Sequence, residues 1–444
     1  MELSKMTHTK THKHWIETNL IPNLVKNQKL IELKSPIENV ELKSFEIKEM
    51  SHTVAFSLTC CYFVKIVCEI NKPKLQDNNS ANVNDEHTFH LVVKITPALD
   101  ETIYDIFNFS CLFTNEIAAY EFILPSLQCL PYTPKYYYSH NHRSEAAIVL
   151  SNFEIDGWHM STNRFNLSID HIIVSVKRLG EFHGNMYALK HTDAQKFDSI
   201  KNKLVEPRYN HNESTDEWML RLKHGVLRAT KSVRNSDEFR DLIPEEFLQR
   251  IEIVSANVLL YQKKCVQPHE PIAVICHGDY LRNNIAYRYD DDGKAIDAMM
   301  FDFQTLRYAS PMVDLSTFMS LSTGRHERDQ YFWDIFRTYH SNLIQSYLTS
   351  ANIKVFDIPE YLRYDNMLKE YVRYLLYGLT IAGSFLYSIH EPVDFYDGDF
   401  EMSLEKTLTD AYSRGGKTVD FELCALVVDM FRLHQKLNMT LTEM

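Results

Sequence analysis

Short apolar stretches separated by polar turns dominate the first 150 residues. Cys61–Ile70 and Thr88–Ile95 are rich in β-branched and aromatic residues, and residues 71–85 between them are polar. Two such stretches joined by a polar turn predict a β-hairpin. A third short apolar stretch, Ala146–Leu150, predicts a further strand in the same region.

One helical pattern interrupts these strands. Phe113, Ile117, Tyr120 and Leu124 recur at the spacing of a single helical face, and Pro125 follows them. Proline commonly ends a helix, so the pattern predicts a helix that finishes near residue 124. We therefore expect a small antiparallel β-rich domain with one helix over residues 30–150.

From residue 151 onward the pattern becomes mainly that of amphipathic helices. The predicted helices cover residues 169–190, 217–232, 244–265, 327–350, 359–389 and 419–436. A β-rich stretch over residues 271–303 interrupts them. We expect an α+β fold in three parts: an N-terminal extension (1–29), the β-rich domain, and a large helical domain (151–444). His8, His12 and His14 are expected to belong to a disordered tail.

The residues with the clearest chemistry lie in the β-rich interruption. A predicted buried strand runs into the sequence His-Gly-Asp, whose last residue is Asp279. Asn284 follows, and a predicted hairpin over residues 285–301 returns the chain to Asp302. Because the two ends of a hairpin meet, we expect these three side chains to lie close together.

This arrangement suits phosphoryl transfer. That reaction needs a carboxylate to orient and deprotonate a hydroxyl, and hard oxygen ligands for magnesium. Asp279 would be the base, and Asn284 and Asp302 would be the metal ligands. Each residue alone is more often a turn, capping or strand-end residue. Their combination at this spacing favours a phosphotransferase.

ATP phosphates also need a positioned cation, which a carboxylate must hold. Lys94 lies near the end of an apolar strand, on the face opposite to its neighbours Val93 and Ile95. Glu116 flanks the apolar stripe of the predicted helix. We expect a Lys94–Glu116 ion pair, with Glu121 as the alternative partner; two unrelated surface charges remain a further alternative.

Two more residues have open roles. Asp314 lies at the start of an apolar helix, so it could simply favour the helix dipole. Alternatively, it could accept hydrogen bonds from the backbone amides of residues 277–279 and fix that loop. His183 is expected to be a structural histidine in the core.

Charge and composition narrow the class of protein. The 444 residues include 47 basic and 59 acidic residues, which gives a formal net charge of −12. This charge argues against a nucleic-acid or anionic-membrane partner, since both need a basic surface. The N-terminus lacks the apolar core of a secretory signal, and the longest apolar stretch, Tyr374–Ile389, is typical of a buried helix.

The cysteines indicate a reducing compartment. None of the eight falls in a CxxC pair, and most lie inside apolar stretches. They are therefore expected to be buried thiols, and a zinc site is not expected. Taken together, these features predict a cytoplasmic protein without membrane insertion.

Several motifs carry a family resemblance. They are Cys276–Asn284, Phe301–Gln304, Val313–Ser316, Phe113–Glu116 with Tyr120 and Pro125, and Leu179–Gly184. With these motifs the chain resembles insect ecdysteroid kinase-like proteins, also described as choline-kinase-like, which are related to aminoglycoside phosphotransferases and protein kinases. The resemblance implies a protein-kinase-like two-lobed fold with ATP and Mg²⁺ as cofactors, and we expect a monomer. It also implies phosphorylation of a hydroxyl on an ecdysteroid or another small lipophilic compound, as in detoxification.

The chain departs from the family pattern at three places. Leu281 stands where the family usually has Trp. Asn152 lies in the inter-lobe hinge, where the family has Glu-Asp-Leu and where backbone groups are expected to contact adenine. No glycine precedes Gly157, so the hydroxyls of Ser57 and Thr59 are expected to take the place of a glycine-rich nucleotide loop.

Two other functions stay open. A choline or aminoglycoside kinase would share the chemistry, and a carboxylate-lined pocket for a cationic substrate would indicate it. A catalytically weak pseudokinase that only binds a ligand would fit the absence of a nucleotide-loop glycine. Retention of Lys94, Asp279, Asn284 and Asp302 favours an active enzyme, and Mg·ATP binding would separate the two.

Overall fold

The computed structural model describes most of the chain in two compact units. The described residues are 11–27, 29–30, 39–50, 59–71, 84–97, 104–105, 108–127, 133–142, 146–163, 165–209, 217–392 and 403–441. Of these, the first unit holds the residues up to 117 and those from 134 to 157, and the second unit holds the rest.

The first unit is built on a five-stranded antiparallel sheet. Its strands are β1 (Asn39–Glu49), β2 (Cys60–Asn71), β3 (Asn84–Ile95), β5 (Ala147–Ser151) and β4 (Tyr136–His140), in the order β1-β2-β3-β5-β4. The predicted β2–β3 hairpin and the strand near residue 147 are confirmed. The sequence did not predict β1 and β4, which are the two edge strands of the sheet.

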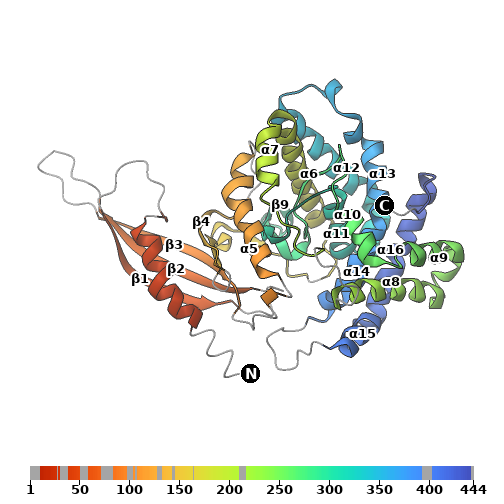
Figure 1. Ribbon diagram of the computed structural model, residues 1–444, viewed down its shortest axis with the longest axis horizontal. Helices are drawn as coiled ribbons and strands as arrows, with labels where there is room; N and C mark the ends of the chain where they lie inside the picture. The colour runs from red at the N-terminus through yellow and green to blue at the C-terminus, as the bar shows by residue number, and fades with distance from the viewer. Residues whose placement is uncertain are drawn as a thin grey trace, which may run out of the picture. The chain divides into compact units, whose positions relative to one another are not determined.

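A helical segment at the N-terminus packs on this sheet, shown in red beside β1 and β2 in Figure 1. It includes a π-helical turn, η1 (Ile16–Leu20), and the helix α2 (Ile21–Lys26). Ile16, Leu20 and Leu24 are buried in one cluster with strand residues. His12 is also buried, and its Nδ1 lies 3.1 Å from the hydroxyl of Tyr62. The prediction that His12 lies in a disordered tail is therefore wrong.

The helix predicted from Phe113 to Leu124 is present and has three parts. It begins as α5 (Phe109–Ala118), continues as a π-helical turn, η2 (Ala119–Ile123), and ends as a 3-10 turn, η3 (Leu124–Ser126). Pro125 lies in that last turn, where its missing N–H interrupts no helical hydrogen bond. The backbone leaves the helical conformation at Leu127.

The second unit is mainly helical. Its helices are α6 (Ile169–Thr192), α7 (Ala194–Lys201), α8 (Glu217–Asn235), α9 (Glu245–Val254), α10 (Val258–Val266), α11 (Met312–Ser322), α12 (Arg325–Ala351), α13 (Tyr364–Arg373), α14 (Leu375–His390), α15 (Leu404–Ser413) and α16 (Gly416–Lys436). Short 3-10 turns of this unit lie at Arg240–Leu242, Arg282–Asn284, Phe303–Thr305, Val355–Asp357 and Glu360–Leu362, whereas the 3-10 turn Phe153–Asp156 belongs to the first unit. Among the described helices, none is both long enough and apolar enough to cross a bilayer.

Two predicted helices are each split in the structure. The helix predicted over 244–265 breaks after Val254, where Ser255 donates its hydroxyl to Ile251 O and Asn257 caps α10 through its side chain. Side chains of this kind compete with the helix for backbone groups. The helix predicted over 359–389 is interrupted at Tyr374, whose hydroxyl donates to Cys265 O.

Glycines allow two pairs of helices to approach closely. A Cβ atom on Gly180 would lie 2.3 Å from Tyr339 O, and one on Gly184 would lie 2.3 Å from Leu343 O. Both glycines are on α6, so its backbone packs directly against α12 (Figure 1). Gly225 on α8 meets Gly383 on α14 in the same way.

Among the described residues, five short strands complete the second unit. β7 (Val274–Cys276) pairs antiparallel with β10 (Arg307–Ala309), and β6 (His159–Met160), β8 (Ile285–Tyr289) and β9 (Ala295–Met300) form a second antiparallel sheet in the order β6-β8-β9. The predicted strand before residue 277 and the predicted hairpin are both confirmed. The whole is an α+β protein, as the sequence predicted, with an antiparallel sheet at the N-terminal side and a mainly helical remainder.

Candidate active site

The turn after β7 depends on Gly278. Its φ is +83°, and a Cβ atom there would lie 1.9 Å from Thr305 O. Residues with side chains rarely adopt this backbone conformation, and no side chain fits at that distance. The glycine at position 278 is therefore a requirement of the backbone.

Asp314 binds the backbone of this turn through two hydrogen bonds. Its Oδ2 accepts the backbone N–H of His277 and its Oδ1 accepts that of Gly278, each at 2.7 Å. Asp314 is fully buried in the first turn of α11. The proposed loop-fixing role is therefore confirmed, and the position in the first turn of α11 is also the one that a helix-dipole role would need.

The carboxyl of Asp314 is held ionised. Burial raises its pKa and is the largest single influence, but the hydrogen bond from His183, attraction to His183 and His277, and the amide of Gly278 together outweigh it. The net result is a pKa below the ordinary value of 3.8. A charged acceptor strengthens the hydrogen bonds that fix the loop.

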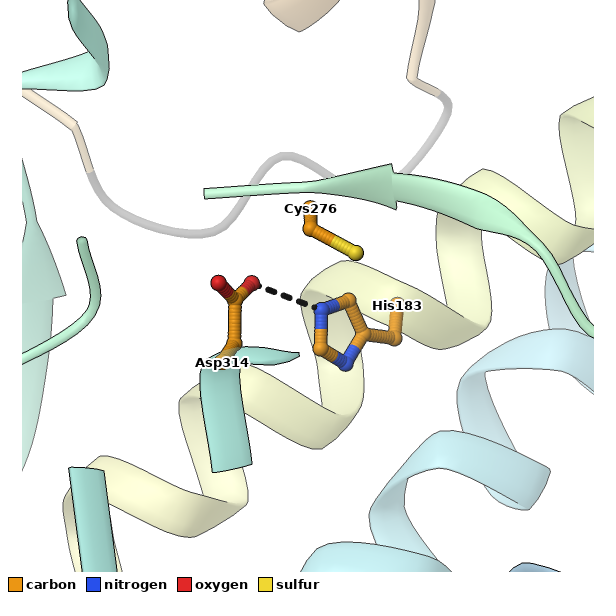
Figure 2. Close-up of side chains that lie close together, drawn as sticks. All are labelled: His183, Cys276 and Asp314. Atoms are coloured by element: carbon orange, nitrogen blue, oxygen red, sulfur yellow. Dashed lines mark hydrogen bonds and ion pairs between the residues drawn. The ribbon is translucent and has the colours of Figure 1, made fainter. Parts of the chain in front are cut away.

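Figure 2 shows His183, Cys276 and Asp314 pointing toward one another. Their ligand-type atoms lie within 4.8 Å of each other, and within the described residues they form the one group of this kind that could hold a metal ion. Each atom already has protein partners, however. His183 Nε2 lies 3.1 Å from Asp314 Oδ2 and its Nδ1 lies 2.9 Å from the Tyr339 hydroxyl.

The thiol of Cys276 is also unsuited to bind a metal ion. It is fully buried and lies 3.4–3.5 Å from the carbonyl oxygens of Val274, Ala309 and Ser310. Burial raises its pKa well above 9.0, so the thiolate that a metal needs is disfavoured. The group is a buried hydrogen-bonded support for the loop, and His183 is the structural histidine that the sequence predicted.

The turn, Asn284 and the end of the β8–β9 hairpin lie together. Asn284 Nδ2 donates to Asp279 O at 2.9 Å and lies 3.4 Å from Asp279 Oδ2. The backbone N–H of Phe301, the residue before Asp302, donates to Asn284 O at 3.1 Å. His277 Nε2 lies 3.0 Å from Phe301 O. The structure thus brings the turn with Asp279 to the same place as Asn284 and the end of β9.

Asp302 is set by an unusual backbone conformation. Its φ of 62° lies in the left-handed region, where residues other than glycine are uncommon. The following residue, Phe303, is fully buried, and its ring contacts those of Tyr120, Phe182 and His277 at centroid distances of 5.0–6.3 Å. This packing fixes the segment that carries Asp302. Such strain is commonly found at functional sites.

In the first unit, Lys94 and Glu116 form the expected ion pair. Lys94 Nζ lies 2.6 Å from Glu116 Oε2, and the two residues are 7% and 1% exposed. The alternative partner Glu121 is exposed. Burying two charges costs desolvation free energy, so this buried pair is weak evidence for a stabilising role.

The remaining predicted nucleotide residues have varied positions. Ser57 lies outside the described residues. Thr59 is almost fully buried just before β2. Asn152 follows β5, donates its backbone N–H to His90 O at 2.8 Å, and uses its side chain to cap the 3-10 turn that follows, by accepting from Glu154 N.

One charged residue beside Asp279 was missed by the sequence analysis. Arg208 Nη2 lies 3.4 Å from Asp279 Oδ1. It belongs to a segment without regular secondary structure, 71 positions earlier in the chain, so no local pattern marks it.

These features, together with the family match, place the chain in the class of small-molecule, kinase-like phosphotransferases. The chain belongs to the ecdysteroid kinase-like family, whose sequence model matches residues 64–353. The family resemblance inferred from the motifs is thereby confirmed.

Other comparisons add little. None of the curated proteins compared with the chain matches it significantly. Among solved structures, the chain is similar to a mutant form of aminoglycoside 2'-phosphotransferase-IIIa in its GDP complex, with 11% identity over 81% of this chain and 90% of that chain. The TM-score is 0.32, a likeness too slight to support a conclusion about fold or function.

Proposed function

We propose that this protein transfers the γ-phosphate of ATP to a hydroxyl of a small lipophilic molecule. The observation that carries the proposal is the cluster of Asp279, Asn284 and the segment of Asp302 around one rigid turn. A carboxylate, an amide and a second carboxylate are the groups that phosphoryl transfer requires. Family membership supports the same reaction class.

Each residue has a separate role in this proposal. Asp279 orients the acceptor hydroxyl and receives its proton. Lys94, held by Glu116, binds phosphate oxygens of ATP, and Thr59, Ser57 and the backbone at Asn152 contribute to nucleotide binding. Asn284 and Asp302 offer the hard oxygen donors that Mg²⁺ prefers, so they fit as its ligands. When bound, Mg²⁺ would neutralise phosphate charge.

The acceptor is proposed to be an ecdysteroid or a related lipophilic alcohol. The family supports this choice. We further propose that the protein acts in the cytoplasm as a monomer.

A transfer assay tests the proposal. Purified protein is incubated with γ-labelled ATP, Mg²⁺ and a panel of ecdysone, phenolic glycosides and choline. We expect labelled ecdysone, and expect that Asp279→Asn abolishes transfer while Mg·ATP still binds. The matched control is Asp291→Asn, an exposed aspartate in the β8–β9 turn, which should keep full activity.

Different results would change the conclusion. Transfer that persists in Asp279→Asn would reject this residue as the base. Labelling of choline in preference to ecdysone would replace the lipophilic acceptor with a cationic one. Absence of any Mg·ATP-induced thermal shift in the parent protein, with no transfer to the panel, would contradict the proposed function as a whole.

A further inference from the structure

Arg208, which forms an ion pair with Asp279, lies in a segment that is held by contacts on both sides of it. On one side, Glu206 Oε1 accepts the backbone N–H groups of Arg208 at 3.0 Å and Tyr209 at 3.3 Å. The same oxygen lies 3.6 Å from Nη2 of Arg307, which is 3% exposed and next to the catalytic turn. The carboxylate thus ties the segment to β10.

On the other side, Tyr209 is buried. Its hydroxyl donates to Gln262 Oε1 at 2.9 Å, and the guanidinium of Arg307 lies over its ring, 5.5 Å from the centroid. With anchors at positions 206 and 209, the backbone of Arg208 has little freedom. The position from which the Arg208 side chain extends is therefore fixed.

The side chain of Arg208 is directed to the candidate base. Its Nη2 lies 3.4 Å from Asp279 Oδ1, and the two side chains are 22% and 18% exposed. Its guanidinium also lies over the ring of Phe385 on α14. Stacking on an aromatic ring and pairing with a carboxylate are both favourable for arginine and limit its rotamers.

The catalytic turn has no comparable cation of its own. Leu281, two positions after Asp279, is apolar and buried. Arg282 is buried, and its Nη1 donates to Asn163 O at 2.8 Å. Within the described part of the chain, Arg208 is the residue whose side chain forms an ion pair with Asp279.

We propose that Arg208 is a further catalytic residue, which hydrogen-bonds the phosphoryl group as it moves from ATP to the acceptor. This role rests on the proposed function. The oxygen of a hydroxyl group bound to Asp279 lies about 2.7 Å from the carboxylate. The phosphorus atom that this oxygen attacks is in contact with it on its other side. A guanidinium paired with that carboxylate is therefore within reach of the transferred group.

The step balances without any change in Arg208. The bond from the acceptor oxygen to the γ-phosphorus forms, and the bond from that phosphorus to the bridging oxygen breaks. The electron pair leaves with ADP, and the hydroxyl proton passes to Asp279. Arg208 keeps its proton and stabilises charge on the oxygens of the phosphoryl group. Its forked guanidinium can bind a carboxylate and a phosphoryl oxygen through different N–H groups, which a lysine does less well.

Three variants test the role. Arg208→Ala removes the cation and Arg208→Lys keeps the charge without the fork. Arg325→Ala is the matched control, because Arg325 is 23% exposed, pairs with Glu238 and lies over the ring of Phe239, 4.8 Å from its centroid. Circular dichroism and the melting temperature report whether each variant folds. If Arg208→Ala does not fold, Arg208→Lys carries the test.

The first measurement is binding by calorimetry. Mg·ADP with aluminium fluoride mimics a phosphoryl group in transfer. We expect Arg208→Ala to leave the dissociation constant for Mg·ATP within about twofold and to weaken binding of this mimic roughly a hundredfold, because the contact is made in the transition state. The second measurement is turnover with ecdysone, where kcat should fall roughly a hundredfold or more, with KM for ecdysone nearly unchanged. Arg208→Lys should lie between parent and alanine variant, and Arg325→Ala should match the parent.

Several outcomes would overturn the role. Higher turnover in Arg208→Ala would show that the ion pair inhibits Asp279 from acting as the base. A change in KM for ecdysone alone would make Arg208 an acceptor-binding residue. Equal binding of the mimic by parent and variant would contradict the proposed transition-state contact, even if the parent transfers phosphate. If the parent binds no Mg·ATP, the proposed function fails first and the role of Arg208 fails with it.

Discussion

The most informative perturbation of the site is Asp314→Asn. The change keeps the shape of the side chain but removes its charge and one acceptor oxygen. In the protein, both carboxylate oxygens accept a backbone N–H of the turn after β7, from His277 and from Gly278. An asparagine amide can accept only one of them, and its NH₂ group would face the other donor.

The expected loss in free energy of unfolding follows from the number of hydrogen bonds that the variant loses. A hydrogen bond to a charged group contributes about 1.5–3 kcal/mol, and a buried N–H left without a partner costs about 1–3 kcal/mol. His183 would also lose a charged partner inside a fully buried site. We therefore expect Asp314→Asn to lower the free energy of unfolding by about 3–5 kcal/mol. A helix-dipole role alone would give about 1 kcal/mol or less.

Urea unfolding at neutral pH measures this difference. The matched control is Asp365→Asn, because Asp365 is an exposed aspartate in the first turn of α13 and can lose only the dipole interaction. Hydrogen exchange at the amides of His277 and Gly278 should also accelerate in Asp314→Asn. If the two variants lose the same free energy, about 1 kcal/mol or less, Asp314 does not fix the turn and the reasoning is refuted.

The pKa of the same Asp314 carboxyl leads to a predicted pH dependence of the protein's stability. Its pKa is lower in the folded protein than the ordinary value of 3.8, so below that value the unfolded state binds the proton more readily. The stabilisation is therefore complete above about pH 4 and is lost as the pH falls through the folded pKa. Between these limits, the parent should lose stability more steeply than Asp314→Asn. Parallel stability curves for the two proteins would contradict this.

Three further predictions concern other positions. Gly278→Ala should cost roughly 3 kcal/mol or more in urea unfolding, because its Cβ would meet Thr305 O at 1.9 Å in a left-handed backbone conformation; a loss below about 1 kcal/mol would show that the turn can shift. Lys94→Met should weaken Mg·ATP binding by calorimetry about 10- to 100-fold and also destabilise the fold, whereas the double variant with Glu116→Gln should recover stability but not binding. Recovery of both would reject a nucleotide role for Lys94. Gly180→Ala should lower the melting temperature although alanine favours helices, because its Cβ would lie 2.3 Å from a backbone oxygen of α12; an unchanged melting temperature would mean that α6 and α12 can separate at low cost.

Much of the fold could be predicted from local patterns. The β2–β3 hairpin, α5, the main helices and the β8–β9 hairpin follow from apolar periodicity and turn residues, which report burial over short distances. The Lys94–Glu116 pair could also be predicted, since strand alternation and helical spacing place both side chains. The turn with Asp279 was recognisable because its residue types and spacing match one reaction closely.

The edge strands and helix breaks could not be predicted in this way. β1 mixes apolar residues with five charged residues, because an edge strand faces water along much of its length. The break before α10 depends on the side chains of Ser255 and Asn257, which read as ordinary polar positions in a helical pattern. The burial of His12 arises only when its helix packs on a sheet that follows it in the chain.

The residues around Asp279 show most clearly what the sequence determined and what it left open. The sequence by itself determined the turn, the base candidate and the two oxygen donors, because a strand, a glycine and a hairpin lie within 30 residues of one another. Only the tertiary structure decided that Asp314 accepts both amides of the turn and that Arg208 pairs with Asp279, the candidate base. These contacts join segments far apart in the chain, and a linear pattern of apolar and polar residues records whether a side chain is buried but not which distant group it meets.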